Sequence, residues 1–548
     1  MIAHGCGCQW LVARTDKVAL MALLPRRRAA WVLLAISGLS LVFAWALASP
    51  IGASPDEPAH VWYAWGTVTG QTFASEHLVP LAAEMATAIR VPQKLLQHPN
   101  PICYMEQPAQ PTTTCAPIPA DNDHLLTQKS YMTRYPPVYY AVEGAVLRTG
   151  VAANLSGSRV LYGARLASAI LSLLTAVFGV FLLAQRFPAR IVLLATLLAL
   201  PAMAWFLAAS VNPNGLEITA AFLLAAGVLS MRFDFAAGVR SAAAVVAVPL
   251  GTLLLAWSRP LSWVWAALIL ALLLVPCGTS EGQSWIKRLP ILKLGKAATA
   301  ATILVLASSM VWFVYAIQIR TEAGVNVAGW AALNPFERIG LLLVGLGSIA
   351  SEQIGNFGWE DTPLPTVALF AWVAITAVAA AAWAMGRHTL VPRWSLGAVL
   401  GLGYLAALLE EYTGGWVWQG RYLLPVTAAM CVFALPGLKS GLERWKASKA
   451  MVSGMLVVLM AVNALSVLWF LLRNAYGVLN LTLRRIPSTP LPVGTAKWIP
   501  PLGGQPMVVG LVTVAFACGV VAVWALRPVS SDMPPEAATK PGASRGST

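Results

Sequence analysis

The chain has 548 residues, of which 58% are apolar and 11% are charged. Soluble globular domains have about 45–50% apolar and about 25% charged residues, so this composition excludes a soluble domain, a disordered chain and a collagen. A polytopic membrane protein remains. The net charge of +15 would by itself fit a nucleic-acid-binding protein, but the distribution of that charge along the chain indicates another cause.

The apolar segments predict an all-α polytopic integral membrane protein with about 12 transmembrane helices, because most of them reach the ~17–25 residues that a helix needs to cross the hydrocarbon core. Two short segments are separated only by Ser258-Arg259-Pro260 and form either a hairpin of two spans or a re-entrant pair. The segments are 30–48, 162–184, 190–209, 215–231, 241–257, 261–276, 297–317, 365–385, 395–412, 422–438, 451–472 and 506–526.

Lysine and arginine gather in every second connection between these segments, beginning with the N-terminal tail. The positive-inside rule then places both termini in the cytoplasm and the alternate connections outside. The basic charge is thus explained by topology in a multi-pass protein of the plasma membrane, and no nucleic-acid partner is predicted. Arg26-Arg27-Arg28 directly precedes the first segment, which identifies that segment as a signal anchor.

The connections differ greatly in length. The first outer loop is long enough to be either functional or disordered, and its aromatic content favours a folded structure. The predicted parts are a cytoplasmic tail (1–29), a first transmembrane helix (30–48), an extracytoplasmic loop with an acidic motif (49–161), transmembrane helices (162–317), a second extracytoplasmic loop (318–364), transmembrane helices (365–526) and a disordered cytoplasmic tail (527–548).

Two smaller features lie in these loops. Segment 337–350 is apolar but too short to span, which indicates an interfacial or re-entrant helix. Cys103 and Cys115 lie twelve residues apart in the first outer loop, and this spacing on the oxidising side is compatible with a disulfide.

The strongest local feature is Ser54-Pro55-Asp56-Glu57-Pro58-Ala59-His60, a few residues after the first apolar segment. Pro58 favours an extended conformation at the residue before it and suits the first position of a helix, so one of the two acids would cap that helix. In an extended corner, neighbouring side chains point in opposite directions, and only one carboxylate would face a given site. The functional interpretation is a general base that deprotonates an acceptor hydroxyl. The alternative is a helix cap with solvated charge.

The same motif raises the question of a metal. Asp56 and His60 would share one face of a helix and offer two ligands to a divalent cation, whereas a structural site takes more. The sequence therefore predicts no definite cofactor and leaves a divalent metal open.

Two arginines accompany aromatic residues that suit sugar and phosphate. Arg134 and Tyr139 belong to Thr133-Arg134-Tyr135-Pro136-Pro137-Val138-Tyr139-Tyr140, late in the first outer loop, where aromatic rings stack on sugars and a guanidinium group binds phosphate. Arg259, between the two short segments, is a further phosphate candidate. The alternatives are an interfacial aromatic belt and an arginine that reaches back to the membrane surface.

Two more motifs lie at later outer positions. Arg421 and Tyr422 stand at the entrance of an apolar segment, where the arginine would clamp phosphate oxygens or anchor the interface. Glu360 and Asp361 lie in the second outer loop and offer carboxylates near the membrane.

Nucleotide-binding and hydrolase signatures are missing from the sequence, including a phosphate-binding P-loop and a metalloprotease HExxH. An activated substrate or energy would have to come from the membrane, from a gradient, or not at all.

Five short motifs together resemble an uncharacterised family of bacterial predicted membrane proteins (domain of unknown function 2142), which is related to the GT-C glycosyltransferases. The resemblance covers about 30–530. The matching motifs are SPDEPAH (54–60), YPPVYY (135–140), VNPNG (211–215), GWEDTPLP (358–365) and QGRYLLP (419–425).

The resemblance implies a GT-C-like polytopic enzyme that uses a sugar linked to polyprenyl phosphate and a glycan or lipid acceptor at the outer face. It implies that Asp56 or Glu57 is the catalytic base, and we prefer Asp56 because the proline after Glu57 makes that residue the helix cap. Arg421, Arg134 and Arg259, in falling order, would stabilise the leaving phosphate. His60, Tyr139, Tyr422, Glu360 and Asp361 complete the expected substrate-binding set.

Two other classes of function stay open. A transporter or flippase of lipid-linked glycans would favour charged residues deep in the spans or broken helices, and the short pair at 241–276 is the only hint of these. An accessory scaffold of an envelope-synthesis complex would tolerate changes of the outer carboxylates. The partners expected in every case are membrane lipids.

Overall fold

The computed structural model describes residues 17–72, 78–81, 84–96, 105, 107, 118–277, 285–318, 333–388, 390–414, 419–477 and 496–526. Cys103 and Cys115, and with them the expected disulfide, lie outside the described residues, as does the predicted tail 527–548.

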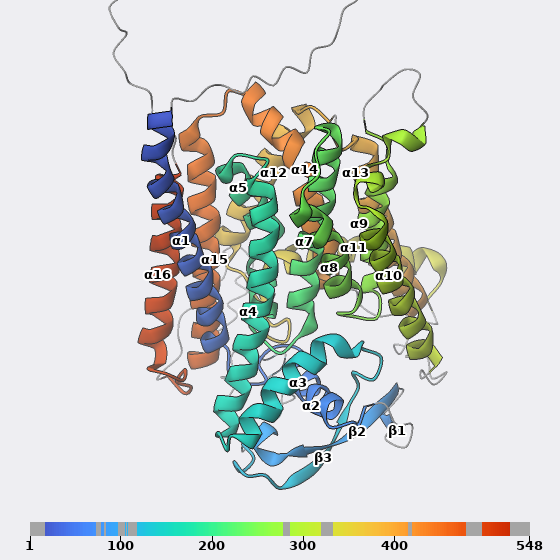
Figure 1. Cartoon of the computed structure of the whole chain (residues 1–548). Helices are drawn as coiled ribbons and strands as arrows, with labels where there is room; N and C mark the ends of the chain where they lie inside the picture. The colour runs from blue at the N-terminus through green and yellow to red at the C-terminus, as the bar shows by residue number, and fades with distance from the viewer. Residues whose placement is uncertain are drawn as a thin grey trace, which may run out of the picture.

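Long helices lie side by side and form a bundle (Figure 1). The helices of the bundle are α1 (Lys17–Ala48), α4 (Gly157–Ala184), α5 (Ala189–Ala199), α6 (Ala202–Ala208), α7 (Pro213–Ala236), α8 (Ala242–Ala256), α9 (Ser262–Ala271), α10 (Lys296–Gln318), α11 (Pro335–Gly355), α12 (Thr366–Met385), α13 (Arg393–Gly414), α14 (Leu424–Arg444), α15 (Lys449–Tyr476) and α16 (Gly504–Ala525). Short 3-10 helices are η2 (Gln93–Leu96), η4 (Leu272–Leu274), η5 (Trp285–Arg288), η6 (Pro290–Lys293) and η7 (Gly420–Leu423).

Eight helices in the described part of the chain are long and apolar enough to cross a membrane. Helices α5 and α6 together form a ninth apolar unit, which bends by 71° between them. Pro201 accounts for the break, because it lacks an N–H group and disfavours a helical residue before it. Helices α8 and α9 are shorter. The predicted helical, multi-pass fold is confirmed, with two small β-sheets in the described residues that the all-α prediction did not include. The count of twelve spans stays a prediction.

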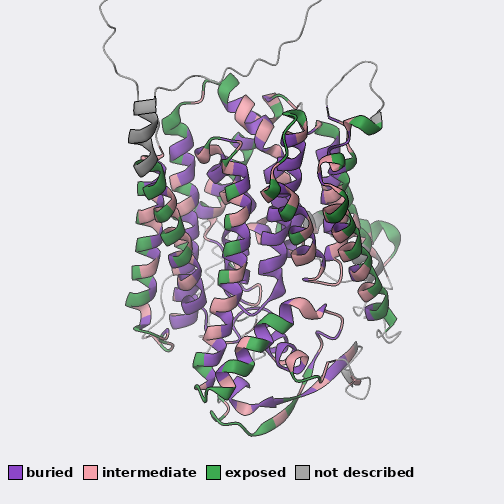
Figure 2. Cartoon of the chain, in the orientation of Figure 1, coloured by how far each residue is buried: buried purple, intermediate pink, exposed green. Residues whose placement is uncertain are grey.

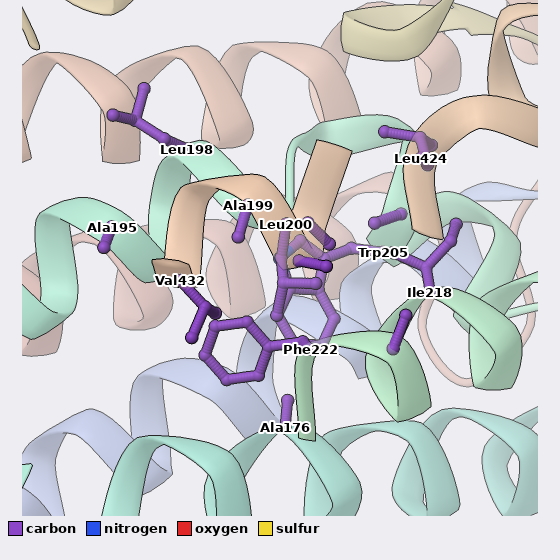
Figure 3. Close-up of a cluster of buried hydrophobic side chains, with 14 of the residues drawn as sticks. Ala176, Ala195, Leu198, Ala199, Leu200, Trp205, Ile218, Phe222, Leu424 and Val432 are labelled. Atoms are coloured by element: carbon purple, nitrogen blue, oxygen red, sulfur yellow. The ribbon is translucent and has the colours of Figure 1, made fainter. Parts of the chain in front are cut away.

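Helix α7 forms the centre of the bundle, and 94% of its most apolar window is buried inside the protein. Figure 3 shows Phe222 of α7 among side chains of neighbouring helices, including Ala176 of α4, Leu198 of α5 and Val432 of α14. A Cβ atom at Gly179 would come within 2.7 Å of the Phe222 ring, so glycine is what lets α4 approach α7. Small residues at such crossings are typical of helix packing in membranes.

One end of the bundle carries a smaller folded unit, which we call the loop face (Figure 1, lower end). The loop face lies between α1 and α4 in sequence. Its elements are α2 (Glu57–Val68), β1 (Leu78–Leu81), β2 (Glu84–Pro92), β3 (Leu125–Ser130) and α3 (Pro137–Ala152), with the strands in an antiparallel sheet of order β1-β2-β3.

Helix α2 packs on this sheet through two specific bonds. The Ser130 hydroxyl at the end of β3 donates to the carbonyl of Ala59 at 2.8 Å, and the Trp65 indole donates to the carbonyl of Arg90 at 3.1 Å. The residues that follow β3 therefore lie directly beside the start of α2.

Helix α11 contains the segment 337–350, for which an interfacial or re-entrant helix was expected. It begins with a capping box between Asn334 and Glu337, which satisfies free N–H groups at its start. It ends in a hairpin of β4 (Asn356–Phe357) and β5 (Thr362–Pro363). A Cβ atom at Gly420 would lie 2.2 Å from a backbone oxygen of α11, so α11 sets the position of η7.

Candidate functional site

Side chains from four distant parts of the sequence converge at the loop face. They come from the start of α2, the residues after β3, the β4–β5 hairpin and the start of η7. Arg259, in the turn between α8 and α9, joins them through Tyr135 and Tyr422.

The expectation that Glu57 caps the helix is wrong: Asp56 stands at the N-cap of α2, without a side-chain cap bond, and Glu57 is the first helical residue. Asp56 has a left-handed backbone conformation, with φ of 62°. Such a backbone is uncommon outside glycine and is best tolerated by Asp and Asn. The carboxylate is 28% exposed and accepts a hydrogen bond from the Tyr131 hydroxyl at 2.7 Å on Oδ1. Its Oδ2 lies 3.5 Å from Nη2 of Arg421. Asp56 is therefore held in place and still reachable.

Glu57 points the opposite way and is buried. Arg165 of α4 binds it through two donors, Nε at 2.7 Å from Oε1 and Nη2 at 2.5 Å from Oε2. The backbone N–H groups of Gly52 and Val211 donate to the same carboxylate at 2.9 and 3.1 Å. Each oxygen of Glu57 thus has two donors, and its role in this geometry is to anchor the corner that presents Asp56.

Arg421 is 3% exposed and lies between two partly exposed carboxylates. Besides Asp56, it faces Oε1 of Glu360, which is 3.6 Å from Nη1 and 29% exposed. Within the part of the chain that the structure describes, Nε and Nη1 of Arg421 have no hydrogen-bond acceptor. Buried donors without acceptors cost about 1–3 kcal/mol each, so this guanidinium group is prepared for an anion.

Glu360 repeats the geometry of Asp56. Its backbone is also left-handed, with φ of 64°, and the acid that follows it is buried. Asp361 accepts a bond from Nη2 of Arg473 at 2.7 Å, with exposed fractions of 1% for Arg473 and 2% for Asp361. The structure thus places Glu360 beside Arg421 and Asp361 in a buried ion pair, where Asp361 anchors the hairpin.

A second arginine lies beside the same aromatic residues. The guanidinium carbon of Arg259 is 4.3 Å from the centre of the Tyr422 ring, and that of Arg421 is 5.3 Å from it. Arg259 also contacts Glu217 of α7 at 3.4 Å and donates to the Tyr135 hydroxyl at 3.4 Å. Its Nε has no acceptor among the described residues. Two cations that share one ring form a site suited to phosphate oxygens.

His60 is fully enclosed at the back of the site. Its Nδ1 is 2.7 Å from the Tyr140 hydroxyl. The pKa of His60 is lowered from 6.5 to about 3, chiefly by burial and also by the charges of Arg259 and Arg421, against the opposing effect of Asp56. The imidazole is therefore neutral at neutral pH and supports the aromatic wall of the site. Burial, together with the charge of Asp56, raises the pKa of the Tyr131 hydroxyl, which keeps it a donor.

Two other predicted site residues make contacts outside the group around Arg421. Tyr139 is buried between α3 and α4, where its hydroxyl is 2.9 Å from that of Ser168. Arg134 lies in the turn before α3, and its carbonyl accepts a bond from Trp312 of α10 at 3.2 Å.

The sequence analysis missed three residues that shape the site. Arg165 lies inside the apolar segment 162–184 and Arg473 directly follows the segment 451–472, and a charge at membrane depth by default marks a paired or functional group. Tyr131 gave no such signal, because its contact with Asp56 depends on how β3 lies against α2.

No three His, Cys, Asp or Glu side chains of the described chain lie close enough together to hold a metal ion. The divalent metal that the sequence left open thus has no ready set of ligands among these residues, and the positive charge beside Asp56 belongs to Arg421.

The chain was also compared with known proteins. The family described as "Predicted membrane protein (DUF2142)" matches residues 39–430. The comparison with curated proteins gives no match.

Several solved structures are similar to this chain, and three of them each have 14% identity to it. ArnT from Cupriavidus metallidurans bound to undecaprenyl phosphate has a TM-score of 0.38 over 93% of this chain and 77% of that one. Its apo form has a TM-score of 0.40 over 90% and 76%. An oligosaccharyltransferase from Archaeoglobus fulgidus in complex with Zn and sulfate has a TM-score of 0.37 over 80% and 53%. Scores this low carry no argument about substrate.

Replacing Arg165 with Met tests the anchor. We expect a loss of roughly 3–5 kcal/mol in the free energy of unfolding, because Glu57 is left buried without its partner. The matched control is Lys439→Met, which breaks a surface pair with Glu443 and should cost about 0.3–0.5 kcal/mol. Unfolding of both variants in the same lipid measures the difference, and equal losses would contradict the assignment.

The buried histidine predicts a pH dependence of stability. The unfolded chain takes up a proton at His60 near pH 6.5, whereas the folded protein does so only near pH 3. The contribution of His60 is therefore complete above pH 6.5 and falls as the pH drops, by about 1.4 kcal/mol per pH unit.

Unfolding of wild type and His60→Gln at pH 7 and pH 5 measures this effect. The wild type should lose more stability than the variant, and His124→Gln, which changes an exposed histidine, should behave like the wild type. The same loss in wild type and His60→Gln would refute the prediction.

Proposed function

The chain belongs to the DUF2142 family of predicted membrane proteins, and we propose that it is a membrane glycosyltransferase, which moves a sugar from a polyprenyl-phosphate donor to a glycan or lipid acceptor of the cell envelope. One observation carries the proposal: Asp56, a reachable carboxylate, lies 3.5 Å from Arg421, a buried guanidinium group with unused donors. A base and an anion-binding cation side by side are what transfer from a phosphate-linked donor needs.

Asp56 acts as the general base in this proposal. Tyr131 fixes one carboxylate oxygen, so the other can approach an acceptor hydroxyl without loss of orientation. The acceptor oxygen forms a bond to the anomeric carbon of the sugar as its proton passes to Asp56. The bond between that carbon and the phosphate oxygen breaks, and the polyprenyl phosphate departs with the electron pair.

Arg421 stabilises the negative charge that develops on the leaving phosphate. The guanidinium groups of Arg421 and Arg259 both lie beside the ring of Tyr422. Their N–H groups without acceptors would share the phosphate oxygens. Preorganised donors of this kind act strongest where water is excluded, and Arg421 is 3% exposed. Glu360, on the opposite side of Arg421, is positioned to bind hydroxyl groups of the sugar or acceptor.

A lipid-linked donor agrees with the architecture. The site lies at the end of a helix bundle beside several apolar helices, where a phosphate carried on a lipid chain arrives from the membrane. The charge distribution of the connections supports a loop face outside the cytoplasm, both termini inside and a location in the plasma membrane, which are parts of this proposal.

The transporter alternative predicted broken helices, and α5 and α6 are such a pair. The segment after α6, however, stabilises the turn that contains Asp56 and Glu57. Val211 donates to Glu57, and Asn212 donates to the carbonyl of Pro55 at 3.1 Å. The break thus has a role in positioning Asp56, and we favour transfer over transport. Retained flipping in a variant without transfer would reverse this preference.

Asp56→Asn tests the base. We expect sugar transfer to fall by about 10²–10⁴-fold with no loss of stability, because Asp56 is partly exposed. The measurement is the envelope-glycan profile of a deletion strain that carries each variant at a matched membrane level. The control is Asp123→Asn, which changes a 58% exposed carboxylate of the same loop. Full rescue by Asp56→Asn would remove Asp56 from the reaction.

Arg421→Met tests the cation. Transfer should fall by roughly 10²–10³-fold, the usual effect of losing one charge-stabilising donor, and Arg421→Lys should recover only part of it because lysine lacks the forked donors. Rates over a range of donor concentrations with purified protein measure this. Arg148→Gln, an exposed arginine of α3, is the control. An unchanged rate in Arg421→Met would rule out its role at the phosphate.

A further inference from the structure

A cavity of about 590 Å³ lies within the bundle, away from the candidate site. Its walls come from α1, α4, α5, α6, α15 and α16, and include Trp31, Gly38, Phe181, Leu197 and Phe516. The volume is in the range of roughly 300–1,000 Å³ that ligand pockets have. The hydroxyl groups of Ser37 and Thr196, which also line it, bond to backbone carbonyls.

The cavity belongs to the half of the bundle opposite the loop face. On α1 its lining begins at Trp31 and ends at Leu41, whereas the loop-face end of α1 is Ala48. On α4 the lining begins at Leu173, two turns beyond Arg165, and ends at Gln185. The lining of this cavity includes neither Asp56 nor Arg421, and the cavity is therefore separate from the candidate site.

Positive charge lies at the far end of the cavity. Arg26, Arg27 and Arg28 are exposed on the first described turns of α1, where Figure 2 shows an exposed stripe along that helix. Arg27 precedes Trp31 by four residues and Leu34 by seven, so it lies on the helix face that lines the cavity. The apolar cavity thus lies about one helical turn from a basic cluster on the same face of α1.

We propose that this cavity binds one acyl chain of an anionic phospholipid, whose phosphate group lies against Arg27 and Arg28. A hydrocarbon chain is as well solvated by the bilayer as by an apolar cavity, so burial alone gives no preference for one lipid. The charge at the mouth supplies that preference, since a basic residue near the membrane surface adds about 1 kcal/mol for an anionic headgroup. The site is independent of the glycosyltransferase function proposed above.

The test uses the full chain in vesicles of phosphatidylcholine that contain either spin-labelled phosphatidylglycerol or spin-labelled phosphatidylcholine. The immobilised fraction of each label measures binding. Wild type should hold the anionic label more strongly, and Arg27→Gln and Arg28→Gln should each reduce this selectivity by about fivefold. Arg148→Gln, at the other end of the molecule, should leave it unchanged.

Variants that fill the cavity distinguish the contribution of the acyl chain from that of the lipid headgroup. Gly38→Leu places its side chain against Leu173, which a Cβ atom already approaches to 3.1 Å, and Val177→Phe fills the cavity from a half-exposed position. Both should abolish the tight anionic component although the arginines remain. Gly454→Leu, at a glycine with open space around it, is the control.

Two results would overturn the proposal. The first is equal immobilisation of both labels in wild type. The second is displacement of the anionic label by one equivalent of polyprenyl phosphate, which would assign the cavity to the tail of a donor lipid.

Discussion

The buried ion pair between Arg165 and Glu57 is the interaction on which the candidate site depends. It joins the start of α2 to α4, while the same guanidinium group donates to the carbonyl of Ser49 and the same carboxylate accepts the N–H group of Val211. Three chain segments meet α4 at one charge pair, and the left-handed backbone of Asp56 is fixed beside it. Breaking such a pair leaves a charge in a medium of low dielectric constant, so the corner has a single arrangement, as a positioned base requires.

The same arrangement occurs twice. In Asp56-Glu57 and in Glu360-Asp361 the first acid has a left-handed backbone and a partly exposed side chain beside Arg421, and the second is buried against an arginine of a helix. In each pair the chain turns at the left-handed first acid, and the two side chains reach different partners. Each pair thus combines an anchor with a reachable carboxylate, and two loops far apart in sequence present their carboxylates to one guanidinium group.

The sequence predicted the parts of this arrangement that depend on local rules. The prolines around Asp56 indicated a helix start at which the two acids face opposite ways, and the structure has that corner. Local rules do not predict contacts between distant segments. The bond from Tyr131 to Asp56 depends on how β3 packs against α2, and the position of Arg421 depends on the packing of η7 on α11. Arg165 could have been identified from the sequence, because a charge in an apolar segment requires a partner.

Buried arginines in this chain differ in how completely they are satisfied, and the difference separates anchoring from binding. All N–H groups of Arg165 meet acceptors. Arg232, at the opposite end of α7, leaves Nη2 without an acceptor among the described residues, but its other nitrogens bond to three carbonyls. Among the described residues, Arg421 has a 3.4 Å bond to Tyr422 and faces two carboxylates at 3.5 and 3.6 Å. Each missing acceptor costs about 1–3 kcal/mol. In the proposed function the phosphate of the donor would supply acceptors to Arg421, and binding would recover this free energy.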